Sequence, residues 1–367
     1  MKYQVPFLDL RVTDEAERRE LLEAFEGVLR HGRLVMGPEV EQLETEVARY
    51  CGRRFAVSVG SGSSALYLAL RALGIGAGDE VITTSLSWIA TANAIALTGA
   101  TPVFADIDDD LNIDPSSVRR LIGRRTRAIV PVHYTGKVCR MDALAAIAGD
   151  AGLLLVEDAA QAFGATLRGR AAGSFGDAAS FSMNPMKVFA ALGEAGVVVT
   201  DREDVRDRLV RLRYNGTVNR ETCLEPGPNG RMDTVQAALL LRRLSRLPAV
   251  LSRRREIAGV YAHHLAGVVG VPVESPEQRD VYYTYQIQCD RRDALKAFLE
   301  GEGIETKIQH PIAMPDQPAY AGEARGEFSN ARRLIARILC IPVHEKLTDE
   351  DLDHVVDSIV RFGAGPG

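Results

Sequence analysis

The sequence has few of the features that mark secreted, metal-binding or membrane-spanning proteins. Among its 367 residues there are five cysteines, an odd number, widely spaced and without a CxxC pair. This spacing argues against a disulfide framework and against a zinc site, so no metal is expected. No stretch reaches the roughly 18 uninterrupted apolar residues needed to cross a bilayer, and the N-terminal MKYQVPFLDL has no apolar segment of signal-peptide length. We expect a reduced, soluble, cytoplasmic protein without a membrane partner.

An excess of positive charge is also missing. The 44 lysines and arginines are outnumbered by 49 aspartates and glutamates, which gives a formal net charge of −5. The densest basic cluster, LSRRREIAGVY, lies in a helical pattern, where a solvated helix face is the favoured interpretation and a phosphate or substrate contact the alternative. We therefore expect no nucleic-acid partner. A hydrophobic fraction of 46% is ordinary for a globular protein, and the length suits a large domain with a smaller one.

Short apolar runs that alternate with helical patterns indicate the fold class. Residues 13–30 are predicted to form a helix, because a cap residue and an acidic first turn open the segment. A second helix is expected to start at Gly37-Pro38 and to stop at Gly52. The alternation predicts βαβ units, and hence an α/β fold whose mostly parallel central sheet is flanked by helices. The predicted strands lie in RFAVSV, EVITT, ATPVFADID, TRAIVPV, GLLLVED, AASFS and AGVVVT.

The pattern changes in the last third of the chain. A long helical stretch interrupted by Pro248 is followed by the alternating pattern of DVYYTYQIQCD and by another helix. This order predicts a smaller α+β domain at the C-terminus. We expect a large domain with an N-terminal arm over residues 1–246 and a small domain over residues 247–367.

Several polar residues follow the predicted strands, at the edge where ligands of parallel sheets collect. The turn VGSGSS places N–H groups and hydroxyls at the start of a helix, which suits a phosphate, although an ordinary tight turn with a serine cap is about as consistent. The residues expected to share one site are Ser61 to Ser64, His133, Glu157, Asp158 and Lys187.

Lys187 stands alone in the apolar stretch FSMNPMKVFAALG. It is either a surface lysine or a nucleophilic amine able to form a Schiff base. Asp158 either caps the following helix or pairs with a protonated ring nitrogen. An aspartate at a strand end and a lysine in a nearby loop are the pair that pyridoxal 5′-phosphate enzymes use.

Eight segments stand in a characteristic order: VPFLDL, GRLVMGPEVEQLETEVARYCG, SGSSALYLAL, DEVITTSLSWIATANAIALTGATPVFADID, VEDAAQAFGA, SFSMNPMK, GEAGVVVT and NGRMDTVQAALL. Together they resemble the sugar aminotransferases of the DegT/DnrJ/EryC1/StrS family, which are fold-type I pyridoxal 5′-phosphate enzymes. The resemblance covers nearly the whole chain. It implies the fold-type I PLP-transferase fold, with pyridoxal 5′-phosphate as the cofactor.

The resemblance assigns four residues to the cofactor ring. Lys187 matches the Schiff-base lysine, and Asp158 matches the carboxylate under the pyridine nitrogen. Gln161 matches the glutamine near the ring hydroxyl. Trp88 matches the aromatic side chain that stacks on the ring face, whereas a lone tryptophan is otherwise most often a packing anchor.

The resemblance also assigns residues to the cofactor phosphate. Ser63 and Ser64 match turn residues whose backbone groups hold it, and Ser182 matches a phosphate-binding hydroxyl. Asn229, in NGRMD, matches an asparagine that reaches the phosphate from the partner subunit. If this match holds, the active site is shared across a homodimer.

Two segments depart from the commoner family pattern. Val188 follows the lysine where many relatives have asparagine, which suggests a change on the substrate side of the ring. VHYTGK replaces a commoner VHLYG pattern, and His133 in it is either a structural histidine or a substrate contact. In KIQHPI, Lys307 and His310 either meet a phosphate or carboxylate or lie on a solvated loop.

The function implied by the resemblance is transfer of an amino group from an amino-acid donor, L-glutamate, to a keto sugar. A nucleotide-linked 3-keto or 4-keto hexose is the leading acceptor, and a free keto sugar acid is the alternative. A sugar dehydratase of the same family carries histidine at the lysine position, so Lys187 argues against that reaction. A non-enzymatic regulator finds no support, since the chain has no helix-turn-helix segment, basic patch or tail.

Overall fold

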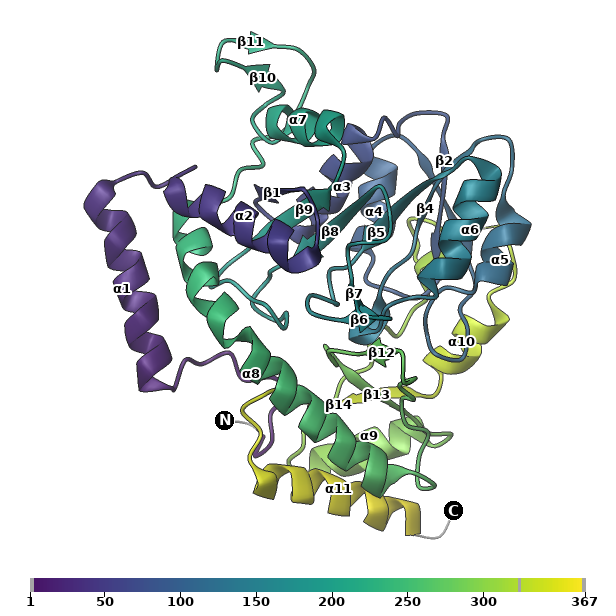
Figure 1. The fold of residues 1–367 in the computed structure, drawn as a ribbon. Coiled ribbons are helices and arrows are strands. Elements are labelled where there is room, and N and C mark those ends of the chain that lie inside the picture. Colours follow the sequence, from purple (N-terminus) through teal and green to yellow (C-terminus); the bar gives the residue numbers. More distant parts are fainter. Residues whose placement is uncertain (1–2, 323–324, 365–367) are drawn as a thin grey trace.

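The structure is a computed structural model that describes residues 3–322 and 325–364. Seven strands form its central sheet: β1 (Phe55–Val59), β2 (Glu80–Thr84), β3 (Thr101–Ala105), β4 (Thr126–Val130), β5 (Leu154–Asp158), β8 (Ala178–Ser182) and β9 (Gly196–Thr200). In the sheet they follow the order β1-β9-β8-β5-β4-β2-β3 (Figure 1).

The sheet is mixed, with one strand running against the others. β2 pairs in parallel with β3 and β4, β4 with β5, and β5 with β8. β9 is antiparallel to both β1 and β8. The chain passes from β8 to β9 through residues 183–195, which hold no helix, so it returns without the crossover that a parallel strand needs. The expected mostly parallel α/β sheet is confirmed.

Helices cover both faces of the sheet (Figure 1). The α-helices of the described residues are α1 (Glu15–His31), α2 (Pro38–Cys51), α3 (Gly62–Ala72), α4 (Ala90–Leu97), α5 (Pro115–Leu121), α6 (Met141–Ala151), α7 (Glu203–Leu212), α8 (Thr234–Leu265), α9 (Arg292–Gly301), α10 (Ser329–Ile335) and α11 (Asp349–Ala364), and not all of them lie on the sheet. Val81 and Val156 pack with residues of α3, α4 and α7, whereas Ile82 and Leu155 pack with residues of α2, α5, α6 and α8. Because successive strand side chains point to opposite faces, each strand contributes to both cores.

A separate core lies toward the C-terminus. β13 (Tyr285–Gln288) pairs antiparallel with β14 (Ile338–Ile341), and α9, α11 and the end of α8 pack around them. Val5, from the N-terminal arm, is fully buried in this core and forms a parallel bridge with Ile304. This is the α+β arrangement expected of the C-terminal part. The division after residue 246 stays a prediction.

Two helices begin and end where the sequence signals them. α1 begins behind Asp14, whose carboxylate accepts a 2.6 Å hydrogen bond from the N–H of Glu17. α2 begins at Pro38 and stops at Gly52, which has a left-handed φ of 65°. A residue with a Cβ is strained in that conformation, so glycine terminates the helix there.

The interruption expected at Pro248 is wrong, because α8 continues through this residue from Thr234 to Leu265. Proline removes one hydrogen bond of the helix ladder, the one to the carbonyl four residues earlier. Pro248 is exposed, so water can reach this side of the helix. The expected domain boundary at residues 246 and 247 therefore falls inside a continuous helix.

Short elements complete the fold. β6 (Thr166–Leu167), β7 (Arg170–Ala171) and β12 (Gln278–Arg279) form a three-stranded sheet. The hairpin of β10 (Thr217–Val218) and β11 (Thr222–Cys223) projects from the body beyond α7 (Figure 1). Among the described residues, no helix has the length and apolar character to cross a membrane.

Candidate active site

A cavity of about 590 Å³ lies where β5 and β8 end, at the carboxyl edge expected for a ligand site. It brings together six of the eight residues that the sequence assigned to the cofactor: Ser63, Trp88, Asp158, Gln161, Ser182 and Lys187. Ser64 and Asn229 do not line it. Gly62, which belongs to the expected turn from Ser61 to Ser64, also lines the cavity, and so do Thr91, Glu194 and Tyr283, which the sequence did not assign.

One end of the cavity is formed by the first turn of α3. Ser61 caps the helix, since its Oγ accepts a 3.1 Å hydrogen bond from the N–H of Ser64. Gly62 lies so close to Ser182 that an added Cβ would be 2.4 Å from the Ser182 Cβ. The N–H groups of Gly62 and Ser63 have no partner within the helix. N–H groups of this kind at a helix start, next to the Ser182 hydroxyl, suit a phosphate.

Asp158 provides a buried carboxylate at the end of β5. Its Oδ2 accepts a 2.8 Å hydrogen bond from the hydroxyl of Thr91, and its Oδ1 accepts a 3.2 Å bond from the N–H of Ala160. Burial raises the pKa of Asp158, while these hydrogen bonds and the nearby ammonium of Lys187 oppose the rise. A cation in the cavity therefore finds a carboxylate that is already oriented.

Gln161 has a fixed orientation. Its Oε1 accepts a 2.9 Å hydrogen bond from the backbone N–H of Thr135, which leaves the two amide N–H groups as the free donors of this side chain. Because Gln161 lines the cavity, these donors are available to a hydroxyl or oxyanion there.

Trp88 is 61% exposed in the loop between β2 and α4. A packing anchor would be buried, so the structure contradicts that alternative. The indole lies beside His310, with 5.6 Å between the ring centroids. Its flat face is thus available to a ligand in the cavity.

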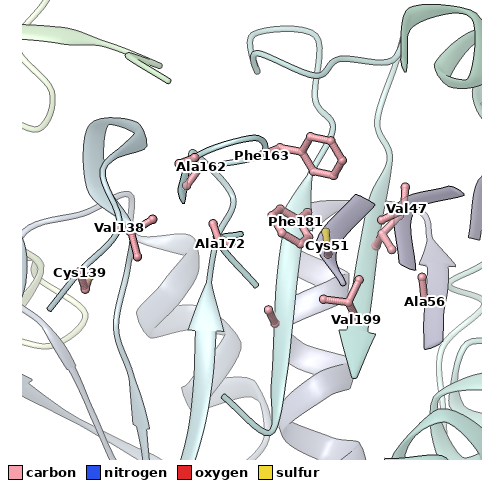
Figure 2. Packing of buried hydrophobic residues seen from close by; sticks show 14 of the residues in the cluster. Val47, Cys51, Ala56, Val138, Cys139, Ala162, Phe163, Ala172, Phe181 and Val199 are labelled. Atoms are coloured by element: carbon pink, nitrogen blue, oxygen red, sulfur yellow. The ribbon is translucent and has the colours of Figure 1, made fainter. Parts of the chain in front are cut away.

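Three phenylalanines hold the segments that carry the polar site residues. Phe163 packs against Phe181 and Phe189, with ring centroids 5.1 Å and 4.6 Å apart. Figure 2 shows Phe163 and Phe181 in the core of the α2 and α8 face. These rings lie two, one and two positions from Gln161, Ser182 and Lys187 in the sequence. Close packing of the rings therefore fixes the backbone beneath three lining residues.

The amine of Lys187 is placed by Tyr283, whose ring centroid is 4.2 Å from the Nζ. Tyr283 precedes β13, so a residue from the C-terminal part of the chain covers a lysine in the connection between β8 and β9. Such a contact holds an amine through cation–π attraction when it is protonated. Val188, the departure next to the lysine, packs against the hydrophobic core and does not line the cavity.

Residues 307–311 form another part of the cavity wall, and a buried tyrosine holds it. The hydroxyl of Tyr134 donates to the carbonyl of Gln309, which also accepts a 2.8 Å hydrogen bond from Gln286 Nε2. His310, the next residue, is partly enclosed, and burial together with the ammonium of Lys187 lowers its pKa to about 4. His310 is consequently a neutral side chain at neutral pH.

His133 and Glu157 do not reach the cavity. Both are fully buried, and the Nε2 of His133 lies 2.9 Å from the Glu157 carboxylate. The Nδ1 of His133 accepts a 3.2 Å bond from the N–H of Cys139, which fixes a neutral ring that donates through Nε2. Of the two interpretations of His133, the structural one is correct.

Asn229 lies outside the cavity on the surface of its own chain. Its Oδ1 accepts a 2.9 Å hydrogen bond from Arg231, whose guanidinium stacks on Tyr214. Its backbone forms a bridge with Tyr214. An exposed, ordered asparagine of this kind is accessible to a second subunit.

The lining residues fit pyridoxal 5′-phosphate at each of its functional groups. The α3 turn and Ser182 suit the phosphate, Asp158 suits the ring nitrogen, the Gln161 amide suits the ring hydroxyl, and Lys187 suits the aldehyde. A Cβ at position 62 would collide with Ser182, so the phosphate end depends on glycine. Among the described residues, no group of histidine, cysteine and acidic side chains could hold a metal ion.

The fold and this site define a pyridoxal 5′-phosphate-dependent aminotransferase. The model of the DegT/DnrJ/EryC1/StrS aminotransferase family matches residues 15–360, so the chain belongs to this family of sugar aminotransferases.

Individual relatives match over almost the entire chain. A dTDP-3-amino-3,4,6-trideoxy-alpha-D-glucose transaminase from Streptomyces venezuelae is 41% identical over 361 residues, which are 97% of this chain and 95% of the relative. A protein of Geobacillus stearothermophilus named a pleiotropic regulatory protein is 36% identical over 365 residues, 98% of each chain. The crystal structure of NtdA from Bacillus subtilis with bound cofactor PMP has a TM-score of 0.93 at 30% identity, covering 99% of this chain and 86% of that one.

Proposed function

We propose that this enzyme moves an amino group from L-glutamate to a nucleotide-linked 3-keto or 4-keto deoxyhexose. The observation that carries the proposal is the single cavity in which Lys187, Asp158 and Gln161 converge. The relative from Streptomyces venezuelae, which is named for a dTDP-linked 3-amino sugar, supports the acceptor class. The alternative acceptor, a free keto sugar acid, lacks the nucleotide and is separated from it by the experiment below.

Each lining residue has a role in this proposal. Lys187 holds the cofactor through its Nζ, and Asp158 keeps a proton on the ring nitrogen. Gln161 donates an amide N–H to the ring hydroxyl, and Trp88 covers one ring face. Ser63 and Ser182 bind the phosphate, together with the free N–H groups of the α3 turn. The bound cofactor supplies an electron sink for the bonds around the reacting carbon.

Lys187 has a second task once its Nζ is released. An amine in that position would accept the proton from the α-carbon of the donor and deliver it to the bound cofactor. In the acceptor half-reaction, it would move a proton in the reverse direction, from the cofactor to the sugar carbon. Tyr283 limits the directions in which this Nζ moves, since its ring centroid lies 4.2 Å away. The same groups serve both half-reactions, which predicts ping-pong kinetics.

A homodimer with a shared site is part of the proposal. Asn229 is exposed and would reach the partner's cofactor phosphate. On α1, Leu22, Phe25 and Leu29 are exposed on one helix face, an apolar stripe that a second copy would bury. The proposed small domain begins within α8 at residue 247, and a cytoplasmic location remains the expectation from the sequence.

The test is the absorbance spectrum of protein reconstituted with pyridoxal 5′-phosphate. We expect a visible band that L-glutamate removes, and no such band for Lys187→Ala. Lys296→Ala, which replaces a partly exposed lysine of α9 that does not line the cavity, is the control and should match the wild type. A wild type without the band would refute the assignment of Lys187. After glutamate treatment, a dTDP-linked 3-keto sugar should restore the band, whereas restoration by a free keto sugar acid alone would select the alternative acceptor.

A further inference from the structure

We propose that Lys307 binds the anionic group of a substrate at the cavity wall formed by residues 307–311. This inference rests on the proposed function and extends it to a residue with no role in holding the cofactor. The anion is a carboxylate of the amino donor or the diphosphate of the sugar nucleotide. Both present the same chemistry to a lysine, an oxyanion that accepts hydrogen bonds from an ammonium.

Lys307 lies on an ordered segment of the cavity wall. Its backbone N–H donates a 3.1 Å hydrogen bond to the carbonyl of Cys340, and its carbonyl accepts a 2.8 Å bond from the N–H of the same residue. Cys340 is a fully buried residue of β14. The backbone of Lys307 is therefore held by the same hydrogen bonds as a strand residue. This contradicts the alternative that Lys307 lies on a solvated loop.

The N-terminal arm supports the ammonium of Lys307. The Nζ lies 5.2 Å from the ring centroid of Phe7. The Nζ forms a 3.7 Å ion pair with Glu305, whose Oε2 accepts a 3.0 Å hydrogen bond from the N–H of Phe7. No hydrogen bond from the Nζ is made to any described residue, so its donors remain available to a ligand.

Among the charged residues that line the cavity, Lys307 is the one available to bind an anionic substrate group. Lys187 is the second lysine in the lining, and the proposed function commits it to the cofactor. Asp158 and Glu194 are the acidic residues there, and no arginine of the described chain lines the cavity. His310 is neutral because burial and Lys187 lower its pKa to about 4. An oxyanion that loses water in the cavity needs a cationic partner, and within this chain Lys307 provides it.

Glutamate and thymidine 5′-diphosphate serve as separate probes of the two anion sources. With the reconstituted enzyme, the glutamate concentration that half-saturates loss of the visible band is measured, and thymidine 5′-diphosphate affinity is measured by calorimetry. Lys307→Met keeps most of the unbranched side chain without its charge, and Lys307→Arg restores the charge. Lys296→Met on α9 is the matched control and should behave as the wild type in both measurements.

We expect Lys307→Met to weaken at least one of the two probes by roughly 10- to 100-fold, the usual range for a hydrogen bond to a charged group. Lys307→Arg should recover most of this loss. A change for glutamate alone identifies the donor carboxylate, and a change for thymidine 5′-diphosphate alone identifies the nucleotide. Unchanged values for both probes would overturn the proposal, and so would an equal loss that arginine does not recover. Failure of the wild type to respond to glutamate would instead count against the proposed function.

Discussion

The hydroxyl of Thr91 donates a 2.8 Å hydrogen bond to the Oδ2 of Asp158, the carboxylate beneath the proposed position of the cofactor ring. Thr91 lies in the first turn of α4 and Asp158 at the end of β5, so a helix and a strand are joined at the floor of the cavity. Burial alone favours the neutral form of Asp158, and the threonine opposes that tendency. Thr91 is therefore a positioning residue for the carboxylate.

Replacement of Thr91 by valine should raise the pKa of Asp158 further and slow the glutamate half-reaction about tenfold, since a hydrogen bond to a charged group contributes about 1.5–3 kcal/mol. The acidic limb of the pH–rate profile should move to higher pH. Single-turnover absorbance measurements from pH 5 to 9 would show both effects. Thr98→Val removes a hydroxyl hydrogen bond at the other end of α4 and should leave the profile in place. An unmoved profile in Thr91→Val would contradict this role.

Alanine at position 62 should damage the phosphate end of the cavity. Its Cβ would lie 2.4 Å from the Ser182 Cβ, so α3 or β8 must move. We expect cofactor affinity to fall at least tenfold, measured by equilibrium titration with pyridoxal 5′-phosphate. Gly259→Ala in α8 meets open space and should bind the cofactor normally, with a gain in stability of about 0.5–1 kcal/mol. Equal cofactor affinity for both variants would show that the close approach of Gly62 and Ser182 is dispensable.

The buried pair of His133 and Glu157 should matter for stability. Burial favours the neutral form of Glu157, but hydrogen bonds from His133 and from the backbone N–H groups of Phe175 and Gly176 outweigh it, so the pKa of Glu157 lies below its ordinary value of 4.5. Glu157→Gln removes a negative charge that these hydrogen-bond donors stabilise. We expect a loss of about 1.5–3 kcal/mol in the free energy of unfolding at pH 7, the range for a hydrogen bond to a charged group.

The pH dependence of this loss has a definite sign. A carboxyl whose pKa is lowered by folding stabilises the protein above its ordinary pKa of 4.5, and this contribution disappears as the pH falls below it. The difference between the wild type and Glu157→Gln should therefore shrink below pH 4.5 in urea titrations. Glu46→Gln, which alters an exposed ion pair with Arg49, should change stability by less than about 1 kcal/mol. A pH-independent difference for Glu157→Gln would contradict the lowered pKa.

The neutral state of His310 can be followed through Trp88, the single tryptophan of the chain. Protonated imidazole quenches indole emission more strongly than the neutral ring, and the ring centroids are 5.6 Å apart. Because the pKa of His310 is lowered from 6.5 to about 4, we expect no fluorescence transition between pH 8 and 5.5. A transition near pH 6.5 that His310→Gln abolishes would show that the ring is solvated.

The same shift predicts how stability depends on pH. The unfolded chain takes up a proton on this histidine near pH 6.5, whereas the folded chain does so only near pH 4. Stability should therefore decrease as the pH falls through this window, by on the order of 3 kcal/mol for the full shift. In His310→Gln this part of the decrease should be absent from urea titrations.

The strand ends predicted that Asp158 and Lys187 lie together, and the family resemblance added Ser182. Asp158 and Ser182 end neighbouring parallel strands, and Lys187 comes within the short connection that follows, so the topology of the sheet brings them to one edge. Within each strand, successive side chains point to opposite faces of the sheet, so the strand positions also indicate which residues enter each core. Such positions can be predicted from the sequence because they depend only on the strand and helix of one βαβ unit.

Residues that reach the site from afar were missed or left open. Tyr283 contacts Lys187 because α8 leads the chain from the large sheet to the C-terminal part. The spacing of the two residues in the sequence does not predict this contact. Gly62 lies within the turn expected from Ser61 to Ser64, but the turn pattern does not show that position 62 needs glycine, since that need arises from contact with Ser182. Pro248 misled for a related reason, because an exposed helix position tolerates the lost hydrogen bond that a buried one would not.

The burial of Val5 against Ile304 has a consequence for how the protein is made. Residue 5 leaves the ribosome early, but its partner emerges only after some 300 further residues, which at typical synthesis rates takes roughly 15–60 s. During this time Val5 has no partner for its bridge, whereas the strands of the central sheet have already been synthesised. The bridge between Val5 and Ile304 therefore forms only after this delay, and the same arm places the Phe7 ring centroid 5.2 Å from the Nζ of Lys307, a residue of the cavity wall.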